Sequence, residues 1–325
     1  MILVRLLADR REAESRVHQV DLWRKQTVLV TGGSGFLGSH LCRRLAQAGA
    51  DVHATSRHKR RADSGTLTWH HSNLSSVHEV RSILARVQPS VVYHLAGSVG
   101  ARPDLELVLP TFQSLLASTV NLLVGATEAG CRRIVLSGSL TEPKAADVNS
   151  TPSSPYAAAK WAASAYGRMF HLLYTSPVVN VTPFMTYGPG QAPGKLIPSV
   201  ILSLLKQEAP QLASGLWEAD WVYVDDVIQG FIDAGVVPGI EGAILDLGTG
   251  TKRTTRHVVE QIVKQMGSPV KPLFGALPDR PQEPVRSADA DGTRRTLGWW
   301  AQTSFEEGLR RTIEWYRNQC TSLAV

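Results

Sequence analysis

A short apolar run that ends in a glycine-rich turn constrains this chain more than any other feature. Residues 27–30 read Thr-Val-Leu-Val, a pattern suited to a buried parallel strand, and residues 31–38 read Thr-Gly-Gly-Ser-Gly-Phe-Leu-Gly. Apolar residues then recur at helical spacing until Gly49, where the helix is expected to end. A strand, a G-x-x-G-x-x-G turn and a helix in this order predict a site for a dinucleotide pyrophosphate, although the glycine spacing alone also suits a plain tight turn.

The glycines of this turn have separate roles in such a site. Gly32 permits the tight turn, Gly35 lets a phosphate approach the backbone, and Gly38 lets the helix pack on the strand. The helix N-terminus adds amide donors and the positive end of the helix dipole. We therefore expect the cofactor to contact Gly32, Ser34, Gly35, Phe36, Leu37 and Gly38.

The second expected strand, near residues 51–55, indicates which dinucleotide binds. A cofactor without a 2′-phosphate needs an acidic residue after this strand to accept hydrogen bonds from the ribose hydroxyls, and none is present. Ser56 and Arg57 instead offer a hydroxyl and a forked cation, which suit a phosphate. We expect NADP(H), with NAD(H) as the alternative, and we expect residues 59–61 to form a solvated basic loop.

Tyr156 and Lys160, in Ser-Pro-Tyr-Ala-Ala-Ala-Lys, form the pattern richest in chemistry. Positions i and i+4 share one face of a helix. A free phenol, with a pKa of about 10, is a poor base near neutral pH. A cation about 4 Å away contributes roughly 4 kcal/mol at an effective dielectric of about 20, and the pair could then exchange a proton with a carbonyl or alcohol. The same spacing also occurs for a core tyrosine beside a lysine whose ammonium reaches water.

Strands and helices alternate through the first part of the chain. The strands are expected near residues 27–31, 51–55, 90–95, 133–137 and 178–183. This alternation predicts an α/β fold with a Rossmann-type doubly wound parallel sheet. After Pro183 the sequence turns to Gly-Pro-rich turns and short elements, and Ser-Phe-Glu-Glu at residues 304–307 predicts a capping box that opens a terminal helix.

Composition is that of an ordinary soluble globule, with 43% apolar and 19% charged residues. The net charge of +6 is spread along the 325 residues without a basic patch interleaved with aromatics, so no nucleic-acid partner is expected. Three scattered cysteines predict no metal site, no disulfide framework and a reducing, cytoplasmic compartment. No apolar stretch approaches the roughly 20 residues that span a bilayer, so no membrane association is expected.

Taken in order, these motifs resemble the extended short-chain dehydrogenase/reductase family, also called the NAD-dependent epimerase/dehydratase family. The resemblance covers roughly residues 26–318. Besides the glycine turn and Tyr156 with Lys160, it depends on Val-Tyr-His-Leu-Ala-Gly at 92–97, Ser-Gly-Ser at 137–139, Tyr-Gly-Pro-Gly-Gln at 187–191, Asp-Trp-Val-Tyr-Val-Asp-Asp at 220–226 and Leu-Gly-Trp at 297–299.

The resemblance implies how the chain is organised. Residues 1–25 would be an N-terminal arm, 26–182 the dinucleotide-binding domain, and 183–325 mostly a smaller substrate-binding lobe, with a segment near 242–250 returning to the main sheet. The substrate would lie between the lobes, at the carboxyl ends of the strands. Family members commonly dimerise through the helix that carries Tyr156 and the long helix near 111–129, so a homodimer is implied.

The resemblance also assigns catalytic roles. Tyr156 would protonate a carbonyl oxygen as hydride arrives from the nicotinamide, or act as the base in reverse. Lys160 would lower the tyrosine pKa and hold the nicotinamide ribose, and Ser139 would hydrogen-bond the reacting oxygen. Ser137 and His94 are interpreted as local structure. Further implied cofactor contacts are Asn73 and Leu74 beside the adenine, and Leu95, Ala96, Gly97, Pro183 and Phe184 at strand ends.

Substrate recognition departs from the family pattern. Thr182 stands where members acting on nucleotide sugars usually have arginine, Met185 where they usually have asparagine, and Ala219 where they often have arginine. These changes remove polar partners for a sugar diphosphate, although Lys195 and Arg280 stand where the family often contacts it. The substrate contacts implied by the resemblance are Ser98, Val99, Ser139, Met185, Lys195, Trp221 and Arg280.

Three reaction types remain open within the family. Dehydratases carry an acidic pair directly after the catalytic threonine, whereas Leu140 and Thr141 follow Ser139, which disfavours dehydration. Because net reduction needs an exchangeable cofactor, commonly NADPH, Arg57 favours a ketoreductase acting on a nucleotide-linked deoxysugar. A nucleotide-sugar epimerase with tightly held NAD and a reductase of a non-nucleotide apolar ketone are the alternatives. Intact Tyr156 and Lys160 disfavour a non-catalytic NADP-binding scaffold.

Overall fold

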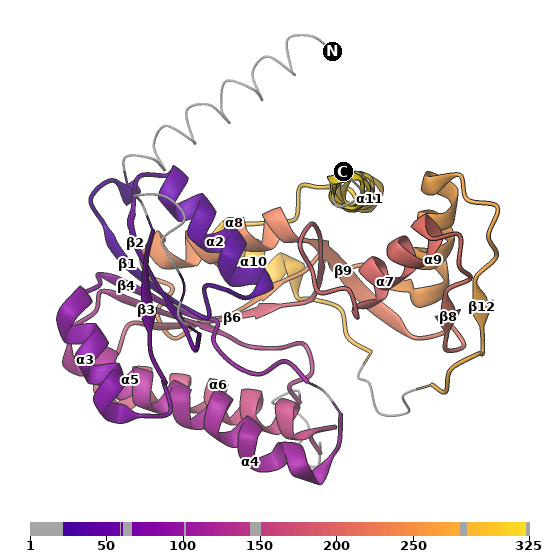
Figure 1. Ribbon diagram of the computed structural model, residues 1–325. Coiled ribbons are helices and arrows are strands. Elements are labelled where there is room, and N and C mark those ends of the chain that lie inside the picture. The colour runs from indigo at the N-terminus through magenta and orange to yellow at the C-terminus, as the bar shows by residue number, and fades with distance from the viewer. Residues whose placement is uncertain are drawn as a thin grey trace.

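A seven-stranded parallel sheet forms the centre of the molecule (Figure 1). The computed structural model describes residues 22–58, 60, 67–100, 102–143, 151–279 and 285–322. The strands, in the order β10-β6-β5-β4-β1-β2-β3, are β10 (Ile244–Leu247), β6 (Val178–Pro183), β5 (Arg133–Ser137), β4 (Val91–His94), β1 (Thr27–Thr31), β2 (Asp51–Ser56) and β3 (Leu67–His71). The order reverses between β1 and β4, which is where ligands bind in open sheets of this kind.

Helices cover both faces of this sheet (Figure 1). One face carries α2 (Phe36–Gln47), α8 (Val224–Val236) and α10 (Ala290–Leu297), and the other carries α3 (Val77–Val87), α5 (Ser118–Glu128) and α6 (Pro155–Tyr174). Alternate strand residues point to opposite faces. Val28 and Val30 therefore pack in the core cluster of α2 and α8, whereas Leu29 packs with α3 and α5. The predicted α/β doubly wound parallel sheet is confirmed.

Two strands of the sheet were not among the five predicted ones. β10 pairs with β6 and lies within the segment near 242–250. β3 pairs with β2 at the edge of the sheet and ends in His70 and His71. Leu67 and Trp69 of β3 pack against the core, and His53 Nδ1 on β2 lies 2.8 Å from His70 Nε2.

The described part of the chain after β6 forms two small sheets and three further helices. These elements are β7 (Met185–Tyr187), α7 (Leu196–Leu205), β8 (Gln211–Leu212), β9 (Glu218–Tyr223), β11 (Lys252–Thr254), α9 (Thr255–Met266), β12 (Leu273–Phe274) and α11 (Phe305–Ser322). β9 pairs with β7 in parallel and with β11 antiparallel, and β12 pairs with β8. The Glu307 N–H donates to Ser304 Oγ at the start of α11, which confirms the predicted helix opening, but the Glu307 carboxylate pairs with Arg310 and Arg311.

Residues 1–21 of the predicted N-terminal arm lie outside the described residues. Trp23, near the end of that arm, is fully buried, and its ring centroid lies 6.4 Å from that of Tyr93 on β4. The expected division of the chain at residues 182 and 183 stays a prediction.

The helical segment from Leu105 to Glu128 changes its winding along its length. A 3₁₀ turn (Leu105–Leu107) leads into α4 (Val108–Thr111), a π-helical turn η2 (Phe112–Ala117) and then α5. By length and composition this segment could cross a membrane, so the expectation that no apolar stretch approaches such a length is wrong. Core helices of soluble proteins pass the same test, and here Leu115, Leu122 and Leu123 are buried where the segment packs against α3 and α6.

Candidate active site

The glycine turn joins β1 to α2 beside the end of β4. Gly32 has a φ of +69°, and a Cβ added there would lie 2.8 Å from the Ala96 Cα atom. A Cβ added to Gly38 would lie 2.2 Å from the Gly32 carbonyl oxygen, so the helix could not pack as it does. Gly35 is the N-cap of α2 and offers no side-chain acceptor, and the first turn carries no acidic residue. The amide groups of this turn therefore fit an anion such as the pyrophosphate of a dinucleotide.

The backbone after β4 lies against this turn. The Leu95 N–H donates to the Thr31 carbonyl oxygen at 3.3 Å, and the Ala96 N–H donates to Thr31 Oγ1 at 3.2 Å. Gly97 has a φ of +151°, and a Cβ added there would lie 1.9 Å from Leu115 Cδ2 in the π-helical turn. Glycine is therefore required where η2 approaches the predicted cofactor contacts.

His94 is enclosed between two threonines. Thr119 Oγ1 donates to the Leu115 carbonyl oxygen at 2.6 Å, so it accepts a hydrogen bond from His94 Nε2 at 2.9 Å. The other ring nitrogen, Nδ1, then accepts from Thr31 Oγ1 at 2.8 Å. Burial lowers the pKa of His94 to about 3, which keeps the ring neutral. Through these two hydrogen bonds, the ring on β4 connects β1 with α5.

The predicted adenosine contacts lie at the ends of β2 and β3. Ser56 is buried and its Oγ accepts from the His58 N–H at 3.1 Å, while Arg57 is exposed. Asn73 Oδ1 accepts a hydrogen bond from the Ser75 N–H at 3.1 Å. If this side chain contacts adenine, we therefore expect its amide nitrogen to make the contact. Leu74 is buried.

The start of α6 positions the catalytic candidates. Ser154 Oγ accepts from the Ala157 N–H at 3.2 Å and Pro155 occupies the first turn, so the helix begins just before Tyr156. Lys160 lies one turn later, and its Nζ donates to the carbonyl oxygen of Ser137 at 2.7 Å. The Ser139 hydroxyl, beyond the end of β5, hydrogen-bonds Tyr156. Ser139, Tyr156 and Lys160 therefore meet where β5 ends and α6 begins.

The pKa of Tyr156 is raised, which corrects the expectation that Lys160 lowers it. Loss of solvent around the half-buried phenol is the largest cause, and the hydrogen bond from Ser139 opposes it. Burial also lowers the pKa of Lys160 to about 8, which makes its ammonium easier to lose. Desolvation therefore dominates the electrostatics of this pair in the protein alone.

Glu142 was not among the residues predicted from the sequence, and its carboxylate lies at the Ser139 backbone. Glu142 Oε1 accepts from the Ser139 N–H at 2.6 Å, and the Glu142 N–H donates to the Ser139 carbonyl oxygen at 3.1 Å. Desolvation raises the pKa of Glu142. The spacing Ser-x-x-Glu predicts the bond from the Ser139 N–H to the Glu142 carboxylate and could have identified this turn.

Backbone groups at the end of β6, where Pro183 and Phe184 are predicted to contact the cofactor, already form hydrogen bonds within the protein. Phe184 is buried and its N–H donates to the Leu247 carbonyl oxygen at 3.0 Å. β10 therefore already uses this N–H, and the predicted contact of Phe184 with a cofactor stays a prediction. Pro183 ends β6 and has no N–H to give.

The predicted substrate residues are spread over several elements. Met185 is half-buried and lies opposite Trp221 in the pairing of β7 with β9. Trp221 is buried and its Nε1 donates to the Arg253 carbonyl oxygen at 3.2 Å, so it serves packing. Three of the predicted substrate residues are exposed: Lys195 directly before α7, and Ser98 and Val99 after β4. Arg280 lies outside the described residues.

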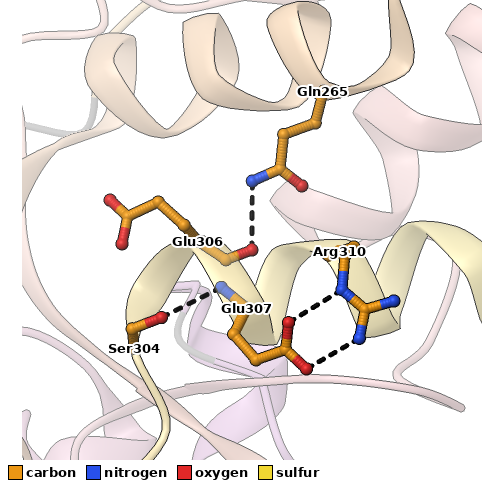
Figure 2. Close-up of a pocket in the computed structure, with 5 residues that line it drawn as sticks. All are labelled: Gln265, Ser304, Glu306, Glu307 and Arg310. Atoms are coloured by element: carbon orange, nitrogen blue, oxygen red, sulfur yellow. Dashed lines mark hydrogen bonds and ion pairs between the residues drawn. The ribbon is translucent and has the colours of Figure 1, made fainter. Parts of the chain in front are cut away.

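A shallow surface pocket of about 470 Å³ lies between α9 and α11 (Figure 2). Its lining residues are Gln265, Ser304, Glu306, Glu307 and Arg310. Gln265 Nε2 donates to the Glu306 carbonyl oxygen at 3.0 Å, and Glu307 pairs with Arg310 at 2.7 Å. Within the described ranges, no group of three or more His, Cys, Asp or Glu side chains could hold a metal ion.

Comparison with known proteins agrees with this arrangement. The profile of the family described as "NAD dependent epimerase/dehydratase family" matches residues 28–235. A "UDP-glucose 4-epimerase" of Mycolicibacterium smegmatis is 31% identical over 90% of this chain and 98% of its own. A "dTDP-glucose 4,6-dehydratase" of Neisseria gonorrhoeae is 28% identical over 91% of this chain and 97% of its own. The solved structure of MoeE5 with UDP-glucose and NAD superposes with a TM-score of 0.80, at 30% identity, over 90% of this chain and 99% of that chain.

These descriptions do not support the expected reaction. The three proteins are named for epimerase or dehydratase activity or for a complex with NAD, so the preference for a reductase using NADP(H) receives no support from them. The chain nevertheless shares their full length and the family's order of motifs. It belongs to the NAD-dependent epimerase/dehydratase family.

Proposed function

We propose that this protein is a nucleotide-sugar 4-epimerase, which inverts a sugar carbon by transient oxidation with tightly held NAD. The observation that carries the proposal is the meeting of Ser139, Tyr156 and Lys160 at the end of β5, two strands from the glycine turn in the sheet. The Mycolicibacterium smegmatis relative, named UDP-glucose 4-epimerase, and the MoeE5 complex with UDP-glucose and NAD support it.

Each of these residues would have a defined task. Bound NAD would supply the acceptor for a hydride and its return. Tyr156 Oη would take the proton from the sugar hydroxyl as the hydride leaves, and would give it back when the ketone is reduced from its other face. Ser139 would hold the same oxygen by a hydrogen bond, and the Lys160 ammonium would hold the ribose of the nicotinamide nucleotide. The raised pKa of Tyr156 keeps its phenol protonated near neutral pH, so the phenolate that the first half needs is the costlier form.

A second candidate is a ketoreductase that consumes NADPH, and Ser56 with Arg57 favours it. Their positions at the end of β2 suit a 2′-phosphate, and Arg57 is exposed. Thermal unfolding tests this candidate directly. If Arg57 binds a 2′-phosphate, NADPH raises the melting temperature more than NADH does, and Arg57→Ala removes the difference. Equal shifts in the wild-type protein would exclude the candidate.

The experiment that separates the two reactions follows sugar and cofactor together. The protein is incubated with UDP-glucose, or with a 4-keto-6-deoxy sugar nucleotide and NADPH, while products are resolved by chromatography and reduced nicotinamide is followed by absorbance. The epimerase yields the C4 epimer without net change in absorbance. A ketoreductase yields the alcohol with stoichiometric loss of absorbance. Failure to convert either substrate would contradict both assignments.

We also infer a homodimer and a cytoplasmic location, as the sequence predicts. The homodimer is predicted through α6 and the long helix near 111–129, and large apolar side chains are exposed on α6, on α4 and on η2. Both properties stay predictions.

A further inference from the structure

Glu142 closes the turn that carries the Ser139 hydroxyl. Its carboxylate and its N–H each form a hydrogen bond with the Ser139 backbone, at 2.6 and 3.1 Å. Within the turn, the Thr141 N–H donates to Ser139 Oγ at 3.3 Å, and the Thr141 and Ser139 hydroxyl oxygens lie 2.9 Å apart. The direction of the Ser139 hydroxyl therefore depends on the position of the Glu142 carboxylate.

Groups from three other parts of the chain fix that position. Ser164, one turn after Lys160 on α6, hydrogen-bonds the Glu142 carboxylate. Arg286 Nη1 donates to two carbonyl oxygens of the turn, at 2.8 and 3.2 Å. A Cβ added to Gly138 would lie 2.8 Å from Glu142 Oε1, so glycine leaves the space that the carboxylate occupies. The turn is thus held between β5, α6 and the segment before α10.

The charge of Glu142 affects the pKa values of both Tyr156 and Lys160, the predicted catalytic pair. Desolvation raises the pKa of Glu142, whereas its hydrogen bonds with Ser164 and Ser139 and the cations Lys160 and Arg286 lower it. In return, the carboxylate raises the pKa of Lys160 and that of Tyr156. The ammonium is therefore easier to keep and the phenolate harder to form than they would be beside a neutral side chain.

We propose that Glu142 is a positioning residue, which orients the Ser139 hydroxyl and keeps the Lys160 ammonium protonated during proton transfer at Tyr156. This inference rests on the proposed function. Glu142 does not act on the sugar directly, because Oε1 is committed to the Ser139 N–H. Its position three residues after Ser139 also differs from that of an acidic pair directly following the catalytic residue.

Two substitutions separate orientation from charge. Glu142→Gln keeps an oxygen acceptor for the Ser139 N–H but removes the charge, so kcat falls and the alkaline limb of the pH–rate profile moves to lower pH. Glu142→Asp keeps the charge but withdraws the carboxylate by one methylene, so kcat falls while the limb stays. We expect losses on the order of 10- to 100-fold, because misplacing a group by about 1 Å can cost about 100-fold in rate. Glu128→Gln, which removes an exposed carboxylate paired with Arg81, is the charge-matched control. It should leave kcat and the alkaline limb of the pH–rate profile unchanged.

A titration that needs no substrate keeps this inference separate from the proposed function. The ultraviolet absorbance of phenolate is titrated in wild type and in Glu142→Gln, each against its Tyr156→Phe counterpart, so that the difference reports Tyr156 alone. The Tyr156 phenolate appears at lower pH in Glu142→Gln. An unchanged titration together with unchanged kcat overturns the role of Glu142. If Glu142→Gln does not fold, wild-type kcat from Glu142→Asp overturns it instead. If the wild-type protein converts no nucleotide sugar, but the Tyr156 phenolate appears at lower pH in Glu142→Gln than in wild type, only the proposed function is overturned.

Discussion

Tyr156 is the residue whose hydroxyl we expect turnover to need most. Tyr156→Phe removes the proton donor and acceptor without changing the ring, so kcat should fall by about 100- to 10,000-fold, the usual contribution of general acid–base catalysis. The affinity for the dinucleotide should stay unchanged, because the glycine turn and α2 are untouched. Tyr166→Phe, on the exposed side of the same helix, is the matched control and should keep full turnover. Substantial activity in Tyr156→Phe would show that another group carries the proton.

The pKa of Lys160 predicts how activity and stability depend on pH. Burial lowers it from 10.5 to about 8, so kcat/KM should fall as pH rises through about 8 and the ammonium is lost. The folded chain binds fewer protons than the unfolded chain between these two values. The contribution of this group to the free energy of unfolding therefore rises with pH across that window, and the buried ammonium costs stability below it. A pH–rate profile without an alkaline limb in this range would contradict the role of Lys160.

At the scale of elements, the packing of α2 on β1 is tested most sharply at Gly38. An added Cβ would meet the Gly32 carbonyl oxygen at 2.2 Å, and backbone cannot give way as a flexible side chain can. Gly38→Ala should lower the free energy of unfolding by about 1–3 kcal/mol, as overpacking usually does, and should weaken dinucleotide binding. Gly194→Ala meets nothing within 4 Å and should change stability by less than about 0.5 kcal/mol. Chemical denaturation and titration with NAD measure both effects, and equal results for the two variants would contradict this packing.

The elements differ in how far the sequence could predict them, for physical reasons. Central parallel strands are buried on both faces and read as apolar runs, as in β1, so they and the turn that follows were predictable. The edge strand β3 reads Leu-Thr-Trp-His-His and is only partly buried, so its sequence gives a weaker signal. The π-helical turn η2 was not predicted from the sequence, and it lies where Leu115 approaches Gly97. In the site, the i, i+4 pair was predictable, but the sign of the Tyr156 pKa shift depends on burial, which only the fold determines.

At the scale of the whole molecule, an apolar face predicts association between two copies. Leu105, Leu109 and Phe112 are exposed by 86%, 73% and 45% beside α6, and a cluster of this kind is costly to leave in water. We expect sedimentation velocity to give twice the chain mass of 35.4 kDa, and the double substitution Leu109→Glu with Phe112→Glu to give the monomer. Leu216→Glu, at an exposed leucine between β8 and β9, is the control and should leave the dimer intact. A wild-type monomer at micromolar concentration would contradict this assignment.

The central claim is that the hydride taken from a sugar carbon returns to the same sugar. UDP-glucose carrying deuterium at C4 tests it most directly, with the product analysed by mass spectrometry and NMR while the absorbance of reduced nicotinamide is followed. The account predicts that the C4 epimer forms with its deuterium retained and with no net change in absorbance, and that Tyr156→Phe forms none. Loss of the deuterium to solvent or to added cofactor, or a protein that binds NAD yet leaves the sugar unchanged, would contradict it.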